Sequence, residues 1–219
     1  MSRLSDAQPP LWRRVLFLDW HGVCSTTRFW HSILGRSSHP YHDEVKAAAD
    51  CLFGQQAVVE RWMRGQARAH DVVSEVDVSL DRRANADFLL RRLIADCQRL
   101  PIDGQVFEAI REATVTWQVV IATDNMDCLT AVLHRRRDLR SVVHAVLSSS
   151  DIGVLKSEAP QAFFGAWLRS RELDFEDAVL VDDAVDNCAA FESCGGQALH
   201  VDCPDQAAHV VRGLARRPL

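Results

Sequence analysis

Short apolar runs of four to six residues alternate with longer helical stretches along this chain of 219 residues. Most runs are apolar throughout, which is typical of a strand that is buried on both faces of a sheet. Strands separated by helices of this length are joined by right-handed crossovers, so the pattern predicts an α/β fold with a parallel sheet and helices on both faces. The expected strands are 15–18, 119–122, 142–147, 178–181 and 198–201.

Residues 24–103 interrupt this alternation. Their segments follow a helical period, with breaks at Gly54, Gly65 and Pro101. An insertion of about eighty residues is too long for a loop. We therefore expect two units, an α/β core made of 13–23 and 104–219 and an inserted helical cap of 24–103. The helices expected in the cap are 41–53, 55–65, 72–78 and 81–100, and those expected in the core are 106–116, 126–137, 159–171, 185–194 and 205–215.

Composition and charge limit the class of protein. With 47% hydrophobic and 25% charged residues, the chain has ordinary globular composition, which excludes disordered and fibrous classes. The net charge of -5 provides no basic excess for nonspecific binding to nucleic acid. No apolar run approaches the length of a bilayer span. We therefore expect a soluble protein without a nucleic-acid or membrane partner, and the oligomeric state stays open.

The seven cysteines lie at irregular spacings, without a Cys-x-x-Cys pair and without matching histidines. This pattern is neither that of a zinc site nor that of a disulfide framework. The odd count and the lack of an apolar signal segment at the N-terminus favour a reducing compartment. We expect the protein to be cytoplasmic.

Polar side chains follow the apolar runs at the ends where ligands bind. In an open parallel sheet the ligand lies outside the carboxyl ends of the strands, at the point where the strand order reverses. Here a carboxylate, a hydroxyl, an ammonium and an acidic pair come after successive runs. These residues are Asp19, Thr123, Asp124, Asn125, Lys156, Asp182 and Asp183.

This set of groups suits phosphoryl transfer at a magnesium site. Mg²⁺ prefers hard oxygen ligands and usually takes one or two carboxylates, which Asp19, Asp182 and Asp183 would supply. A carboxylate can attack phosphorus to form an acyl phosphate, while the metal and a lysine neutralise charge on the transferred group. Thr123 and nearby backbone amides are placed to hydrogen-bond the phosphate oxygens.

With these motifs in this order, the sequence resembles the haloacid dehalogenase-like superfamily. That superfamily has a Rossmann-like sheet as its core, and its members are mostly magnesium-dependent phosphatases. The resemblance covers most of the chain. The insertion is similar to the cap that follows the first motif in the subgroup of small-molecule phosphatases, phosphomutases, phosphonate hydrolases and haloacid dehalogenases. The resemblance to this superfamily implies a Mg²⁺-dependent hydrolase, most often a phosphatase that acts on a small phosphorylated metabolite.

The resemblance also implies roles for individual residues. Asp19 would be the nucleophile and a metal ligand, and the backbone carbonyl of His21 would be a further ligand. Asp182 and Asp183 would hold Mg²⁺ directly or through water.

On the substrate side, the resemblance makes Thr123 a phosphate-binding hydroxyl. Lys156 would steady both Asp19 and the phosphate. We expect substrate contacts at Thr123, Asp124, Asn125 and Lys156, with Thr123 and Lys156 also taking part in catalysis.

His21 departs from the pattern of the superfamily. Phosphatases of this kind usually have a second Asp there, which protonates the leaving alkoxide and then deprotonates the attacking water. An imidazole, with an ordinary pKa of about 6.5, can do both near neutrality, so we expect His21 to be the acid/base. The alternative is a catalytically impaired protein that binds a ligand or a partner protein.

Two other chemistries of the superfamily stay open. Haloacid dehalogenases typically lack the acidic metal pair, so Asp182 and Asp183 argue against them. Phosphonoacetaldehyde hydrolases resemble this chain at Trp20 and use a cap lysine, for which Lys46 is the sole candidate. They have a small residue at the position of His21. Lys46, with Glu44 and Asp50 nearby, is better explained as a solvated charge.

Overall fold

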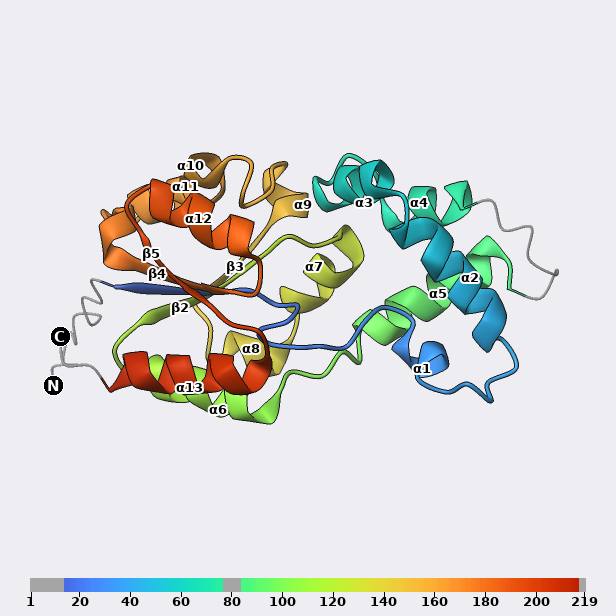
Figure 1. Cartoon of the computed structure of the whole chain (residues 1–219), viewed down its shortest axis with the longest axis horizontal. Coiled ribbons are helices and arrows are strands. Elements are labelled where there is room, and N and C mark those ends of the chain that lie inside the picture. Colours follow the sequence, from blue (N-terminus) through green and yellow to red (C-terminus); the bar gives the residue numbers. More distant parts are fainter. Residues whose placement is uncertain (1–13, 77–83, 217–219) are drawn as a thin grey trace, which may run out of the picture.

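The computed structural model describes residues 14–76 and 84–216, and a five-stranded sheet forms the centre of one half of it (Figure 1). All neighbouring strands pair in parallel, in the order β3-β2-β1-β4-β5. This arrangement confirms the expected α/β fold with a parallel sheet. The strands are β1 (Val15–Leu18), β2 (Gln118–Thr123), β3 (Ala145–Ser148), β4 (Ala178–Asp182) and β5 (Gln197–His200).

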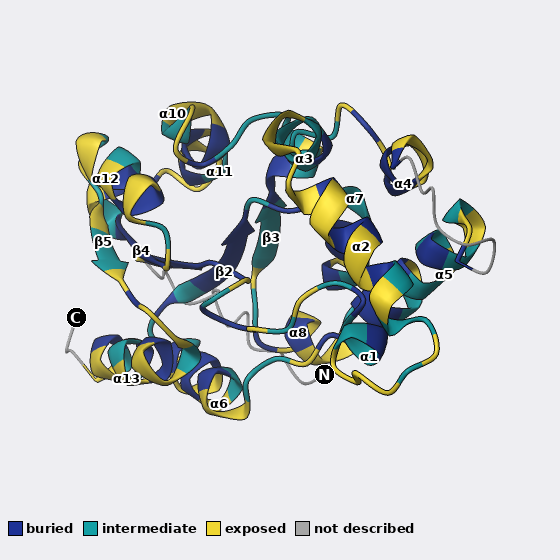
Figure 2. Cartoon of the chain, turned by 45° about the vertical axis from the view of Figure 1, so that its right-hand side comes forward, coloured by how far each residue is buried: buried dark blue, intermediate teal, exposed yellow. Residues whose placement is uncertain are grey.

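Helices cover both faces of the sheet (Figure 1). On one face, Leu16 and Leu18 of β1 belong to the apolar cluster that includes Val106 and Ile110 of α6. On the other face, Phe17 packs edge-on against Phe164, with ring centroids 4.9 Å apart. Figure 2 shows the central strands β1, β2 and β4 buried between helices whose outer faces are exposed. The outer strands β3 and β5 are only partly buried, so the expected burial on both faces is wrong for them, because each has a neighbouring strand on one side alone. The helices of this part are α6 (Gly104–Ala113), α7 (Asp127–Leu133), α8 (Arg137–Arg140), α9 (Ser149–Ile152), α10 (Pro160–Phe163), α11 (Gly165–Arg169), α12 (Val185–Ser193) and α13 (Pro204–Ala215), with a short 3₁₀ helix, η1 (Phe175–Asp177).

Most expected elements differ from the observed ones by one to three residues at an end, and three differ in ways that the contacts explain. The strand expected at 142–147 begins only at Ala145, because the amides of residues 142 and 143 both donate to the Leu139 carbonyl and complete the turn of α8. The helix expected at 126–137 ends at Leu133, and the backbone is extended at Arg136, whose guanidinium donates to the Leu100 carbonyl at 2.6 Å. The helix expected at 159–171 is divided into α10 and α11, between two neighbouring buried phenylalanines.

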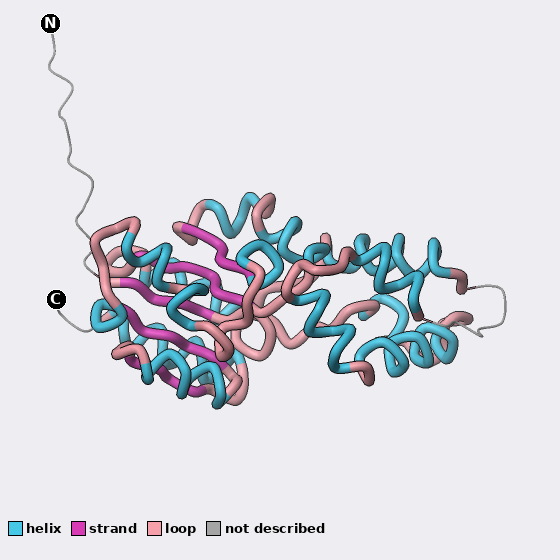
Figure 3. The backbone as a smooth tube through the Cα atoms, turned by 90° about the horizontal axis from the view of Figure 1, so that it is seen from above, coloured by secondary structure: helices cyan, strands magenta, loops and turns pink. Residues whose placement is uncertain are grey.

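Among the described residues, five helices precede α6 in the chain between β1 and β2, and Figures 1 and 3 show these five gathered beyond one end of the sheet. They are α1 (His31–Leu34), α2 (His42–Phe53), α3 (Gln56–Met63), α4 (Ala69–Glu75) and α5 (Ala86–Cys97). The end of the expected helix 72–78 and the beginning of the expected helix 81–100 fall on residues 77–83, which lie outside the described residues. Asp103 N donates to the Cys24 carbonyl at 2.8 Å and so joins the chain entering this helical part to the chain leaving it. The boundaries of the cap at 24 and 103 stay a prediction.

No helix in the described part of the chain is both long enough and apolar enough to cross a membrane. All seven cysteines are free thiols.

Asp127, the first residue of α7, connects the inserted helices to the sheet-bearing part. Its Oδ1 accepts hydrogen bonds from the indole Nε1 of Trp62 at 2.7 Å and from the backbone N of Ala69 at 3.1 Å. The Trp62 side chain is fully buried, so its N–H has no access to water if this partner is lost. One carboxylate oxygen therefore holds α3 and the start of α4 against α7.

We expect Asp127→Ala to lower the free energy of unfolding by about 1–3 kcal/mol, because it leaves the buried Trp62 N–H without an acceptor. Chemical denaturation measures this change. Trp62→Phe in the same background is the matched variant, since it removes the donor that Asp127→Ala leaves unpaired. The double variant should lose less stability than the sum of the two single variants. Strict additivity of the two losses would show that this hydrogen bond does not couple α3 to α7.

Candidate active site

The order of the strands brings the ends of β1, β2 and β4 together. β1 lies between β2 and β4, and Leu18 is in register with Ile121 on one side and Val181 on the other. The chain proceeds from β1 to β2 and β3 on one side, whereas β4 pairs with the opposite edge of β1. This is a switch point, where ligands bind in open α/β sheets. Asp19 directly follows β1 at this point, and its backbone N donates to the Val181 carbonyl at 3.0 Å.

Lys156 lies between the carboxylates that end two neighbouring strands. Its Nζ donates to Asp19 Oδ1 at 2.7 Å, to Asp182 Oδ2 at 2.6 Å and to the Ala122 carbonyl at 3.2 Å. The Lys156 side chain is 1% exposed. One ammonium therefore uses its three donors on the ends of β1, β4 and β2.

The charges of this cluster are strongly coupled. Burial raises the pKa of Asp19 to about 7, and the neighbouring Asp182 acts in the same direction, while Lys156 opposes both. Burial alone would lower the pKa of Lys156, but the surrounding carboxylates, Asp19 and Asp182 first, raise it above its ordinary value. Lys156 is therefore a cation, and the carboxyl groups around it are more numerous than this one positive charge.

Three of these carboxylates are close enough together to hold a metal ion. Asp19, Asp182 and Asp183 each offer one oxygen, and the three oxygens lie within 4.8 Å of one another. Hard oxygen donors of this kind suit Mg²⁺. Lys156 balances one of the negative charges, so a divalent cation would offset the remainder. The donor set and its charge therefore fit the ion expected from the sequence.

Gly22 makes room for Asp183, a role that the sequence analysis missed. Its φ is +83°, a conformation that side-chain-bearing residues rarely adopt, and a Cβ placed there would lie 2.1 Å from Asp183 Oδ2. The turn is held by hydrogen bonds between Gly22 N and the Ser25 carbonyl and between Ser25 N and the Trp20 carbonyl, both 2.8 Å. The sequence feature that could have indicated this role is a glycine three residues after Asp19.

Asn187 is a second positioning residue, at the first turn of α12. Its Nδ2 donates to Asp182 Oδ1 at 3.1 Å, and the backbone N of Ala184 donates to the same oxygen at 2.9 Å. The other oxygen of Asp182 accepts from Lys156. Both oxygens are thus oriented by neighbours, so the direction of the Asp182 carboxylate is set by the beginning of α12.

Thr123, Asp124 and Asn125 lie together at the end of β2. The Thr123 hydroxyl is buried and accepts a long hydrogen bond, 3.4 Å, from Asn125 Nδ2. Asp124 accepts the backbone N–H of Lys156 at 3.1 Å, which orders the chain that carries the buried lysine. The structure thus places Asp124 against Lys156, and both Asp124 and Asn125 line the neighbouring cleft. The contacts of all three residues with substrate stay a prediction.

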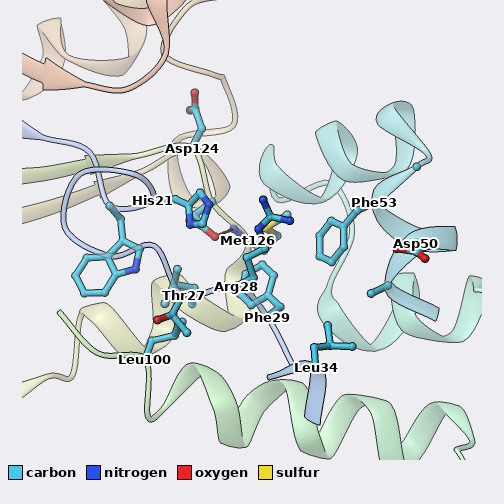
Figure 4. A pocket seen from close by; sticks show the side chains of 15 residues that line it. His21, Thr27, Arg28, Phe29, Leu34, Asp50, Phe53, Leu100, Asp124 and Met126 are labelled. Atoms are coloured by element: carbon cyan, nitrogen blue, oxygen red, sulfur yellow. Dashed lines mark hydrogen bonds between the residues drawn. The ribbon is translucent and has the colours of Figure 1, made fainter. Parts of the chain in front are cut away.

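A cleft of about 620 Å³ adjoins this cluster. His21, Asp124 and Asn125 line it from the side of the sheet, and residues of the inserted helical part, such as Phe29 and Phe53, line the opposite side (Figure 4). Burial lowers the pKa of His21, and Arg28 lowers it further, while Asp183 opposes the change. The cleft therefore presents an imidazole that favours its neutral form.

Comparisons with known proteins identify the fold. No family model matches the sequence, and no curated protein matches it. A predicted HAD-like family hydrolase from Porphyromonas gingivalis is similar in structure, with a TM-score of 0.68 and 13% identity over 94% of this chain and 100% of the other.

Two further structures are similar. A HAD family enzyme from Bacteroides thetaiotaomicron, in complex with magnesium and inorganic phosphate, gives a TM-score of 0.60 at 11% identity, covering 85% of this chain and 93% of the other. The L-2-haloacid dehalogenase from Xanthobacter autotrophicus gives a TM-score of 0.61 at 14% identity, covering 86% of this chain and 77% of the other. This chain therefore has the haloacid dehalogenase-like fold, as the resemblance of its motifs indicated.

We expect Gly22→Ala to weaken Mg²⁺ binding by about 10–100-fold, the usual effect of disturbing the support of a metal ligand. The new methyl group would displace Asp183, and the positive φ would add about 1 kcal/mol of strain. Isothermal titration calorimetry with Mg²⁺ measures the affinity. Gly104→Ala is the control, because a Cβ there meets no atom within 4 Å. Equal affinity in the two variants would contradict the proposed role of Gly22.

Proposed function

We propose that this chain is a magnesium-dependent phosphatase that acts on a small phosphorylated molecule through an aspartyl-phosphate intermediate at Asp19. One observation carries the proposal: Asp19 contacts the buried Lys156 ammonium at 2.7 Å and presents an oxygen within 4.8 Å of those of Asp182 and Asp183. A HAD family enzyme of the same fold was solved with magnesium and inorganic phosphate, which supports the same chemistry here. The free thiols suit a reducing compartment, and we place the enzyme in the cytoplasm.

Asp19, Asp182 and Asp183 would hold the metal ion, together with the backbone carbonyl of His21. When bound, Mg²⁺ stabilises negative charge on the oxygens of the transferred phosphoryl group.

Asp19 is the proposed nucleophile. Its Oδ1 accepts from Lys156, which leaves Oδ2 for attack on phosphorus. The new bond joins Oδ2 to phosphorus, and the bond from phosphorus to the leaving oxygen breaks. Lys156 holds the carboxylate in one orientation and adds positive charge beside the transferred group. Thr123 and Asn125, at the end of β2, would donate hydrogen bonds to the phosphoryl oxygens.

His21 is the proposed acid/base. It lines the cleft two residues after Asp19, on the side from which a leaving group would depart. It would donate a proton to the leaving oxygen and then accept one from the water that attacks the aspartyl phosphate. Attack at phosphorus releases inorganic phosphate and restores the Asp19 carboxylate.

A ligand-binding protein with impaired catalysis is the second candidate. The lowered pKa of His21 favours it, because the neutral imidazole is a much weaker acid than the imidazolium and protonates a leaving alkoxide poorly. The structure adds no support to an imine mechanism: Lys46 is exposed, pairs with Asp50 at 2.5 Å and does not line the cleft. Asp182 and Asp183 continue to argue against a dehalogenase.

We expect Asp19→Asn to abolish hydrolysis of 4-nitrophenyl phosphate, because an amide oxygen is not a competent nucleophile. Chelation of Mg²⁺ with EDTA should abolish the activity of the wild type, and added Mg²⁺ should restore it. Asp186→Asn is the control, since Asp186 is an exposed neighbour of the acidic pair and lies outside the carboxylate trio. Turnover by folded Asp19→Asn, with circular dichroism confirming the fold, would overturn the assignment of the nucleophile.

Substitutions at His21 separate the enzyme from the binding protein. His21→Ala should lower turnover of alkyl phosphates about a hundredfold or more, and turnover of 4-nitrophenyl phosphate much less, because an activated leaving group needs little protonation. His21→Asp should keep or raise turnover. Steady-state kinetics on both substrates measures the difference. If only His21→Asp is active, the native protein is a disabled phosphatase with a binding role.

A further inference from the structure

Arg28 places a guanidinium in the cleft beside the proposed active site. Its side chain makes no hydrogen bond or ion pair within the part of the chain that the structure describes. Figure 4 shows the guanidinium between His21 and Phe53. Arg28 belongs to the segment that leads from β1 to α1, the first of the inserted helices, and it lines the cleft. At this position the guanidinium is accessible to an anion that binds inside the cleft.

The acidic residues of the cleft do not neutralise this charge. Asp50 lines the cleft but pairs with Lys46 at 2.5 Å. Asp124 accepts the backbone N–H of Lys156, and Figure 4 shows its carboxylate directed away from Arg28. A guanidinium beside apolar surface gains most from a bidentate partner such as a carboxylate or a phosphate. Arg28 is exposed and therefore reached by water, and an anionic ligand in the cleft would supply the opposite charge that these two carboxylates do not.

The wall around Arg28 is apolar and partly aromatic. Phe29 and Phe53 stack with ring centroids 6.0 Å apart and an angle of 14° between the rings. Phe53 is 40% exposed, one of the few large apolar side chains with so much accessible surface among the described residues. Leu34, Met126 and Leu129 complete this wall. Such a surface suits a flat or apolar ligand body between the reacting group and Arg28.

We propose that Arg28 binds a second anionic group of the substrate, which lies across an apolar body from the phosphoryl group that Asp19 attacks. This inference rests on the proposed phosphatase function. It narrows the substrate class to phosphate monoesters of small apolar or aromatic molecules that carry a carboxylate or a second phosphate. Arg28 is thus a specificity-determining residue supplied by the inserted segment.

Three probes that share one ring test this assignment: phenyl phosphate, 4-carboxyphenyl phosphate and benzene-1,4-diyl bisphosphate. The first lacks a second anion, and the other two distinguish a carboxylate from a phosphate as its source. The wild type should prefer one of the anionic probes. Arg28→Gln should lower that preference, measured as a ratio of kcat/KM values, about tenfold or more, mainly through KM. Arg28→Lys should retain part of it.

Arg36→Gln is the matched control, because Arg36 is an exposed arginine that does not line the cleft, and it should keep the wild-type ratio. Comparing ratios cancels the different leaving-group strengths of the probes. An equal loss on all three probes in Arg28→Gln would assign Arg28 to the transferred phosphoryl group and overturn the inference. A wild type without preference for an anionic probe would also overturn it.

Failure of the phosphatase proposal is distinguishable from failure of this inference. If the wild type hydrolyses none of the probes, the proposed activity is wrong, and calorimetric binding of the same three probes then tests Arg28 alone. A tighter affinity for an anionic probe that Arg28→Gln abolishes would support the anion site. Equal affinities of the wild type and Arg28→Gln for that probe would refute it.

Discussion

The ammonium of Lys156, held between Asp19 and Asp182, is the contact on which the site and the centre of the sheet both depend. Removing a charge from water costs several kcal/mol, and the cost is recovered only when partners satisfy every donor, as the ends of β1, β4 and β2 do here. Loss of one member of a buried pair typically costs about 3–5 kcal/mol, because the remaining charge has no partner. The same contact therefore stabilises the meeting point of three strands and orients the proposed nucleophile.

Three carboxylates lie close together at this site, whereas Lys156 supplies a single positive charge. Contacts with other residues hold these carboxylates in place. Asn187 and the amide of Ala184 orient Asp182, while Gly22 leaves the space that Asp183 occupies. Groups of like charge kept close together by their surroundings are prepared for a divalent cation before it arrives. The site is thus preorganised by the first turn of α12 and by the turn after β1. The first of these comes shortly after the end of β4 in the chain, and the second comes directly after the end of β1.

The cleft divides the chemistry between two parts of the chain. The ends of the strands contribute the acidic cluster and Lys156, and the inserted segment contributes Arg28 and an aromatic wall. His21 lies where the two meet. In the proposed function, reaction and specificity would depend on different elements, so substitutions in the inserted helices would change the substrate without altering the carboxylate cluster. This division is consistent with a fold that occurs in both a magnesium-binding enzyme and a haloacid dehalogenase.

The sequence alone determined the strands of the sheet and the residues that end them, because a doubly buried parallel strand is a local apolar run and its first polar residue lies at the edge where ligands bind. Asp19, Asp182 and Asp183 could therefore be selected before any distance was known, whereas Lys156 lies beyond α9 and not at the end of β3, so only the order of the motifs pointed to it. The tertiary structure decided what depends on segments far apart in the chain: the division of the helix at 159–171, the close approach of Gly22 to Asp183, and the position of Arg28 beside Phe53. A residue's immediate neighbours set its periodicity, whereas the distance between two side chains depends on how their separate elements pack.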